Sequence, residues 1–229
     1  MPLRRSFAAA VVALAAGGAA LAHDGDPHPA IAGPADAYVF PLAAPGTYRL
    51  PPIRPAADAS LLDEDGRAAS LHGVFQNHLT VLAFVYTRCG DLCPLASLRL
   101  ADLQALAAHD ADVAPHLRLV SLSFDPAYDT PERMAEQAAS YRDPAVTAPS
   151  WTFLTAADEA TIAPVLLAYD QAVARRADPT AAPGPLAHVL RVFLIDEHAV
   201  VRNIYSADFL DPRLVLNDLR TLRMAGAPK

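Results

Sequence analysis

The chain has 229 residues, 53% of them hydrophobic, so it has enough apolar material to bury a substantial core. It carries 18 basic and 25 acidic residues, which gives a net charge of −7. An acidic chain is a poor candidate for nucleic-acid binding, which needs a basic surface to neutralise phosphates, and it suits a cationic partner better.

Residues 1–22 predict an export signal. They begin with a pair of arginines, continue as an apolar run of Ala, Val and Leu, and end in Ala-Leu-Ala, which is typical of a cleavage site. The alternative is an uncleaved N-terminal anchor, for which the run is slightly short and is interrupted by two glycines. We therefore expect the protein in the periplasm, either released or tethered to the outer face of the inner membrane.

Residues 23–56 are rich in proline and predict a flexible linker. Signal cleavage would make His23 the new N-terminus, with two aspartates and His28 close behind. Such a cluster can hold Cu(II) or Zn(II), although a polar tail is the simpler interpretation.

Residues 57–229 predict one domain in which strands and helices alternate. The expected strands are two short ones within 60–71 around an Asp-Gly turn, then 81–86, 117–124, 151–154, 188–195 and 200–205; the expected helices are 92–109, 131–141, 157–169 and 212–224. Thr130 as N-cap and Pro131 at the first helical position predict the start of the second of these helices. This order of elements predicts an α/β fold of the thioredoxin-like type, with three α/β/α layers around a central mixed sheet.

The only two cysteines, Cys89 and Cys93, follow the apolar strand 81–86 where the periodicity changes to that of a helix. A spacing of four places both thiols on one helical face, so they can share a bond or a soft metal ion. A thiol at the start of a helix lies beside the positive end of the helix dipole, so we expect a lowered pKa there.

Four interpretations of this pair compete. A structural disulfide would close a loop of only five residues and would therefore stabilise the fold weakly. A structural zinc site needs four ligands, usually with more closely spaced Cys or His than this chain offers. Thiol redox chemistry and copper binding are left, and a third ligand decides between them.

His188 is the histidine best placed to supply that ligand. It opens the expected strand 188–195 after a loop rich in Pro and Gly, and in a thioredoxin-like sheet this loop approaches the dithiol. Two thiolates and an imidazole form a soft donor set that suits Cu(I) and tolerates Cu(II).

Three segments together resemble the Sco/SenC family, and the resemblance extends from about residue 57 to 224. They are Cys89-Gly-Asp-Leu-Cys93-Pro94, Phe124-Asp125-Pro126-Ala-Tyr-Asp129-Thr130-Pro131 and His188-Val-Leu-Arg-Val-Phe193-Leu194-Ile195-Asp196. The resemblance implies a thioredoxin-like fold, export or membrane anchorage, and copper ligation by Cys89, Cys93 and His188. It also implies a role in inserting copper into cytochrome c oxidase, chiefly its binuclear centre.

The same resemblance leaves a second function open, a thiol:disulfide reductase acting on the apo-oxidase subunit through the redox pair Cys89 and Cys93. Asp125 and Asp129 match an acidic loop that the family associates with copper handling or partner contact, although Asp129 would equally support the start of a helix. A peroxiredoxin-like peroxidase is disfavoured because Thr87 and Arg88 do not form the motif of that family.

Two positions depart from the family pattern. Gly90 stands where proline is common, and we expect it to loosen the loop that carries the cysteines. Val189 stands where a small hydroxyl residue is common, so a hydrogen bond that would orient the imidazole of His188 is expected to be absent or to come from elsewhere.

Overall fold

The computed structural model describes residues 41–90, 92–180 and 182–226. The strands are β1 (Arg54–Pro55), β2 (Ser60–Asp63), β3 (Ala68–Ser70), β4 (Leu79–Val85), β5 (Leu117–Ser123), β6 (Ser150–Thr155), β7 (Val173–Arg175), β8 (Leu186–His188), β9 (Arg191–Ile195) and β10 (Val200–Ser206). The α-helices are α1 (Leu71–Phe75), α2 (Leu92–Ala108), α3 (Pro131–Tyr141), α4 (Glu159–Ala168) and α5 (Pro212–Gly226); two 3-10 turns, η1 (Ala114–His116) and η2 (Ala207–Phe209), complete the set.

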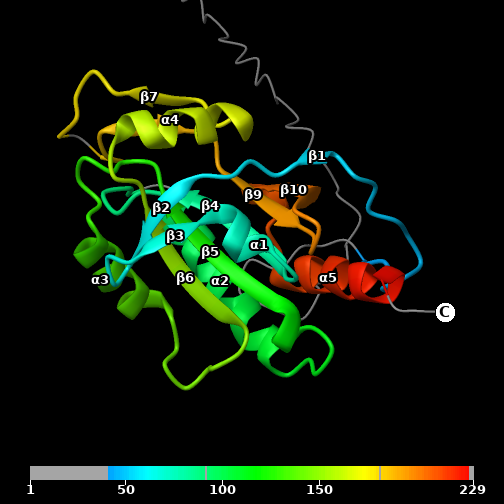
Figure 1. The fold of residues 1–229 in the computed structure, drawn as a ribbon. Coiled ribbons are helices and arrows are strands. Elements are labelled where there is room, and N and C mark those ends of the chain that lie inside the picture. Colours follow the sequence, from blue (N-terminus) through cyan, green and yellow to red (C-terminus); the bar gives the residue numbers. More distant parts are fainter. Residues whose placement is uncertain (1–40, 91, 181, 227–229) are drawn as a thin grey trace, which may run out of the picture.

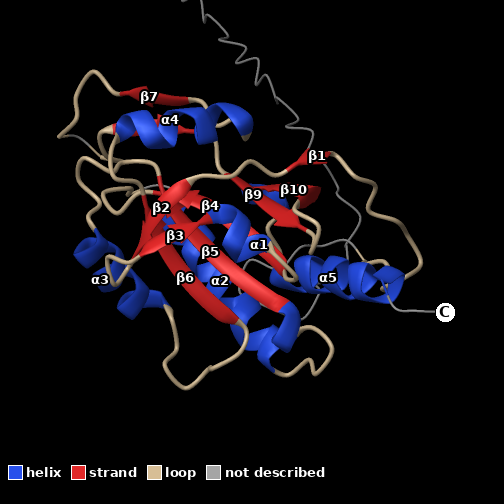
Figure 2. Cartoon of the chain, in the orientation of Figure 1, coloured by secondary structure: helices blue, strands red, loops and turns tan. Residues whose placement is uncertain are grey.

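Eight of the strands form one mixed sheet in the order β1-β10-β9-β4-β5-β6-β2-β3 (Figures 1 and 2). β4 runs parallel to β5, and β5 runs parallel to β6, while the other neighbours are antiparallel. Every residue of β4 is buried, which agrees with the prediction of a strand covered on both faces. The cysteines therefore follow the centre of the sheet.

Helices cover both faces of this sheet. α2 packs on β4 and β5 and has α3 and α5 beside it. On the other face Tyr169, the C-cap of α4, packs against Phe84 and Phe193 with ring centroids 5.3 and 4.9 Å away. The predicted three-layer, thioredoxin-like α/β/α fold is confirmed.

His188 lies differently from the prediction. It does not open a long strand but ends β8, which pairs only with β7 in a separate two-stranded sheet, with Val173 opposite His188. The main sheet resumes at Arg191, because β9 pairs with β4. The exposed Val189 interrupts the strand at a point where no Gly or Pro signals a break in the sequence.

Part of the predicted linker lies against the domain. β1 pairs with β10, the hydroxyl of Tyr48 donates a 2.5 Å hydrogen bond to Asp218 of α5, and the amide of Gly46 donates to Thr221 of the same helix. The predicted signal and the pair His23 and His28 lie outside the described residues. Within the described part of the chain, no helix combines the length and apolar character that crossing a bilayer requires.

Candidate metal centre

The two cysteines lie at the junction of β4 and α2. Cys93 is the second residue of α2 and is fully buried, whereas Cys89 lies in the preceding loop and is 8% exposed. The amide of Cys89 donates a 3.2 Å hydrogen bond to the carbonyl of Tyr86, which closes a tight turn directly after the strand. Neither cysteine forms a disulfide. Both thiols are therefore available as ligands.

His188 reaches this pair from the far part of the sequence. Its Nε2 lies 3.2 Å from the Sγ of Cys93. The two sulfurs and one imidazole nitrogen all lie within 4.8 Å of one another. Two thiols and an imidazole at this separation match the soft donor set that binds monovalent copper, so the residues fit such an ion.

Aromatic side chains hold the imidazole in place. The ring of His188 packs against Phe124 at 4.8 Å and against Tyr86 at 6.1 Å between centroids. The hydroxyl of Tyr86 donates a 2.9 Å hydrogen bond to the carbonyl of Leu186, two residues before His188. The Nδ1 of His188 is buried and has no hydrogen-bond partner among the described residues, which is the first of the two outcomes expected from Val189. The ring is thus oriented by packing, with Nε2 directed at the thiols.

Gly184 permits the close approach of the segment that precedes His188. Its φ of +119° is rarely adopted by other residues, and a Cβ there would overlap the carbonyl oxygen of Arg88 and lie 2.9 Å from the hydroxyl of Tyr86. The main chain next to Cys89 and the main chain leading to His188 therefore touch directly.

The protonation of Cys93 differs from the expectation. A hydrogen bond between the two thiols, together with burial, raises the pKa of Cys93 far above its ordinary value. The helix dipole favours a thiolate by only about 0.3–1 kcal/mol, which is too little to offset enclosure beside a second thiol. Burial, and then the charge of Cys89, raise the pKa of Tyr86 to about 12 in the same enclosure. Without metal, Cys93 is a neutral thiol at physiological pH.

The two predicted aspartates support the residues before Cys89 and do not join the ligand atoms. Asp129 is fully buried and accepts hydrogen bonds from the amide and hydroxyl of Thr87 and, at 2.6 Å, from Ser123. Burial raises its pKa. Asp125 forms a 2.6 Å ion pair with Arg88. The two carboxylates thus brace the turn that presents Cys89.

Asp129 does not support the start of α3 through its side chain. Thr130 is the N-cap residue, as predicted, but makes no side-chain capping hydrogen bond, and Pro131 occupies the first turn. The carboxylate of Asp129 faces the cysteine segment instead.

Three residues of the site were not identified from the sequence. Tyr86 and Phe124 were interpreted as ordinary ends of buried strands, because nothing in an apolar run distinguishes a ring that packs on a ligand. Gly184 carried a usable signal, since a glycine between Pro183 and Pro185 predicts an unusual backbone conformation.

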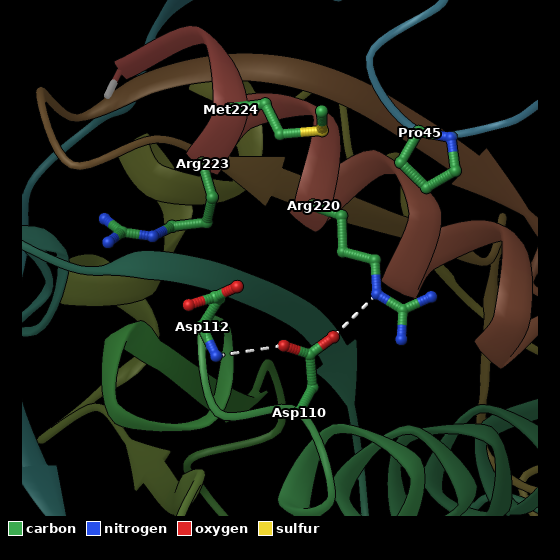
Figure 3. Close-up of a pocket in the computed structure, with 6 residues that line it drawn as sticks. All are labelled: Pro45, Asp110, Asp112, Arg220, Arg223 and Met224. Carbon is green, nitrogen blue, oxygen red and sulfur yellow. Dashed lines mark hydrogen bonds and ion pairs between the residues drawn. The ribbon is translucent and has the colours of Figure 1, made fainter. Parts of the chain in front are cut away.

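A pocket of about 410 Å³ lies away from the cysteines (Figure 3). Asp110, which follows the end of α2, pairs there with Arg220 of α5 at 2.6 Å, and Pro45 and Met224 complete the rim. Because α2 has 17 residues, its two ends are about 25 Å apart. The pocket is therefore no part of the cysteine and histidine cluster.

Comparison of the sequence with known proteins identifies a relative of this chain. The SCO1 protein homolog of Bacillus subtilis (strain 168) is 29% identical over 115 residues, which cover 50% of this chain and 55% of that relative. The chain thus matches about half the length of this curated relative.

Solved structures share the fold. Copper-bound ScoI of Arabidopsis thaliana superposes with a TM-score of 0.62 at 20% identity, covering 75% of this chain and 99% of that one. BsSco, a member of the Sco family of cytochrome c oxidase assembly proteins in which a disulfide switch was identified, gives a TM-score of 0.61 at 20% identity, covering 77% and 98%. The family profile described as SCO1/SenC matches residues 55–223, almost the whole described domain. The chain belongs to the SCO1/SenC family.

Proposed function

We propose that this protein is an exported copper chaperone that delivers copper to, or helps assemble, the copper centre of a respiratory cytochrome c oxidase. The observation that carries the proposal is the convergence of the Cys89, Cys93 and His188 ligand atoms within 4.8 Å. Copper in the related ScoI and the oxidase-assembly role of the Sco family support the choice of metal and of acceptor.

Copper is the cargo of this site, held by two thiolates and the Nε2 of His188. Because both thiols must lose their protons to bind it, copper uptake releases protons and strengthens as the pH rises. The raised pKa of Cys93 extends this dependence to higher pH, because that thiol keeps its proton further into the alkaline range. The Nε2 of His188 already lies 3.2 Å from the Sγ of Cys93, within the space that the ion would share with both thiolates.

Transfer to a partner requires an exchange of ligands and no net chemistry, so the protein acts as a chaperone and not as an enzyme. Cys93 is fully buried, while Cys89 is slightly exposed and His188 is half-buried beside the exposed Val189. An incoming ligand from the acceptor therefore meets His188 and Cys89 first, and Cys93 releases the ion last.

The location of the acceptor follows from the predicted export signal. A periplasmic protein, released or tethered to the inner membrane, meets copper-accepting subunits or other exported cuproproteins at that membrane. The buried positions of Asp125 and Asp129 favour a supporting role for both residues over direct contact with the acceptor.

A thiol:disulfide reductase is the second candidate, favoured by the contact between the two thiols. Cys89, the more exposed thiol, would attack a substrate disulfide, and Cys93 would then attack the Cys89 sulfur, so the dithiol is oxidised while the substrate gains two thiols. The raised pKa of Cys93 disfavours the second step, because it lowers the thiolate fraction at neutral pH.

Copper titration of the reduced full chain tests the proposal. Under competition with a Cu(I) chelator, His188→Ala should weaken binding more than about 10-fold and Cys93→Ser more than about 100-fold, since losing a hydrogen-bond partner of a ligand already costs 10–100-fold. The matched control is His198→Ala, which removes an exposed histidine of the β9–β10 turn and should leave affinity unchanged.

Two results would redirect the proposal. Copper affinity that is unchanged by His188→Ala, together with disulfide reduction that depends on Cys89, would establish the reductase. Full oxidase assembly at limiting copper in cells that lack the protein would point to a different acceptor.

A further inference from the structure

A main-chain hydrogen bond joins the loop that carries Cys89 to the loop that leads into the strand of His188. The cysteine loop is the connection from β4 to α2, and the histidine loop is the connection from β7 to β8. The amide of Gly90, next to Cys89, donates a 2.7 Å hydrogen bond to the carbonyl of Pro183, five residues before His188. This contact is opposite to the expectation that Gly90 loosens the cysteine loop.

The small sheet that holds His188 needs such a contact. β8 pairs only with β7, and neither strand is bonded to the main sheet. The position of His188 relative to the thiols is therefore set by contacts that reach the small sheet from outside. They include the Tyr86 hydroxyl on Leu186, the packing of Phe124 and Tyr86 on the His188 ring, and the contacts between the two loops.

We propose that the Gly90 amide is a positioning group that holds the histidine loop on the cysteine loop in the metal-free protein. With this hydrogen bond in place, the Nε2 of His188 lies 3.2 Å from Cys93 before any metal arrives. The inference rests on the proposed copper function, because positioning of His188 matters only if His188 is a ligand. It assigns a specific role to a residue that is not itself a ligand.

The chain offers a matched pair of substitutions at this position. Gly90→Pro removes the only donor of the hydrogen bond, because proline has no amide hydrogen. Gly90→Ala keeps the donor, and its added Cβ would lie 3.4 Å from the Pro183 oxygen, an ordinary contact. Gly90 does not adopt a positive φ, so alanine introduces no backbone strain there.

The first measurement uses the metal-free wild-type chain and needs no variant. Amide hydrogen exchange at position 90 should be slow compared with other exposed loop amides, since this amide is hydrogen-bonded although its residue is exposed. Nuclear Overhauser contacts between the His188 ring and the Cys93 side chain should be present without copper. Fast exchange and absent contacts would overturn the proposal even if copper binds tightly.

The second measurement compares copper binding in the variants. Gly90→Pro should weaken Cu(I) affinity about five-fold, the value of one typical net hydrogen bond, and should weaken the nitrogen coupling from His188 in the spectrum of the Cu(II) form. Gly90→Ala should show the wild-type Cu(I) affinity and the wild-type nitrogen coupling. Equal behaviour of Gly90→Pro and wild type refutes the positioning role, whereas failure of the wild type to bind copper refutes the proposed function instead.

Discussion

The cysteine segment and the histidine segment reach the same point in different ways. Cys89 and Cys93 are the two ends of one five-residue stretch. The position of this stretch is set by β4, whose residues are all buried, and by the first turn of α2. His188 comes 95 residues after Cys93 and ends a three-residue strand outside the main sheet. One half of the site is set by local structure and the other by tertiary contacts.

This difference indicates which half is more easily lost. The cysteine segment is part of the core of the sheet, so it stays in place as long as the domain is folded. The histidine segment depends on a few contacts at its edges, each of which contributes about 1 kcal/mol. Substitutions at those contacts should therefore change copper binding more than they change the fold, whereas substitutions under the cysteines should change both.

Gly184→Ala should disturb the histidine segment most strongly. The positive φ and the overlap with the Arg88 oxygen each cost up to about 3 kcal/mol, so we expect a loss of about 4 kcal/mol of unfolding free energy and a large loss of copper affinity. Urea unfolding and Cu(I) competition measure the two effects. Gly66→Ala is the control, since Gly66 also has a positive φ but open space around its Cβ. Equal losses in both variants would contradict the close approach of the loops.

Asp129→Ala should disturb the cysteine segment. It leaves the buried amide and hydroxyl of Thr87 and the hydroxyl of Ser123 without their acceptor, so we expect a loss of about 3 kcal/mol in unfolding free energy, with weaker copper binding as Cys89 moves. Asp125→Ala is the comparison. It breaks only an ion pair whose Arg88 partner is 37% exposed, and it should cost less than about 1 kcal/mol. The prediction fails if both variants unfold at the same urea concentration.

Tyr86→Phe sharpens the comparison by removing one contact between the two halves. Loss of the hydrogen bond to Leu186 should lower the unfolding free energy by about 1 kcal/mol and weaken Cu(I) binding a few-fold. Tyr205→Phe removes a 2.7 Å hydrogen bond to Asp218, far from the ligands. It should cost stability and leave copper affinity unchanged, and a drop in its affinity would show that general loosening is enough to impair binding.

The smallest expected effect on copper binding lies outside both segments. Burial and the hydrogen bond to Asp218 raise the pKa of Tyr48 to about 12, from an ordinary value of 10.0. The stability that Tyr48 contributes is therefore fully present below pH 10 and is lost as the pH rises from 10 to 12. The free energy of unfolding, measured across this pH range, should decline less in Tyr48→Phe than in the wild type. An identical decline in both proteins would show that a group other than Tyr48 titrates in this range.

The same difference between local structure and tertiary contacts explains which elements could be predicted from the sequence. β4, α2, β5 and α3 were predicted to within two residues at each end, because buried runs, helical periodicity and the Thr130-Pro131 pair act locally. β7 and β8 were not predicted, since three-residue strands are too short to show alternation. The three candidate ligands were identified by donor chemistry and by resemblance, while their convergence needed the fold.

Features that depend on surroundings were the ones that sequence could not reveal. The raised pKa of Cys93 arises from enclosure and from a second thiol, while the local signal of a helix start pointed in the opposite direction. Gly90 was expected to loosen its loop because glycine is flexible, yet its amide donates to Pro183, 93 positions later in the chain. In both cases the deciding partner lies outside the segment that was interpreted.

The packing of residues 43–50 against α5 has a consequence for how an acceptor can approach. Pro45 and Gly46 lie near Met224, beside the ion pair of Asp110 and Arg220, and so at the end of α2 opposite Cys93 (Figure 3). The polypeptide thus joins the domain some 25 Å from the thiols, the length of α2. Residues 43–48 of the described chain thus lie at the end of α2 remote from Cys93, and under the proposed function they do not stand between the candidate ligands and an acceptor.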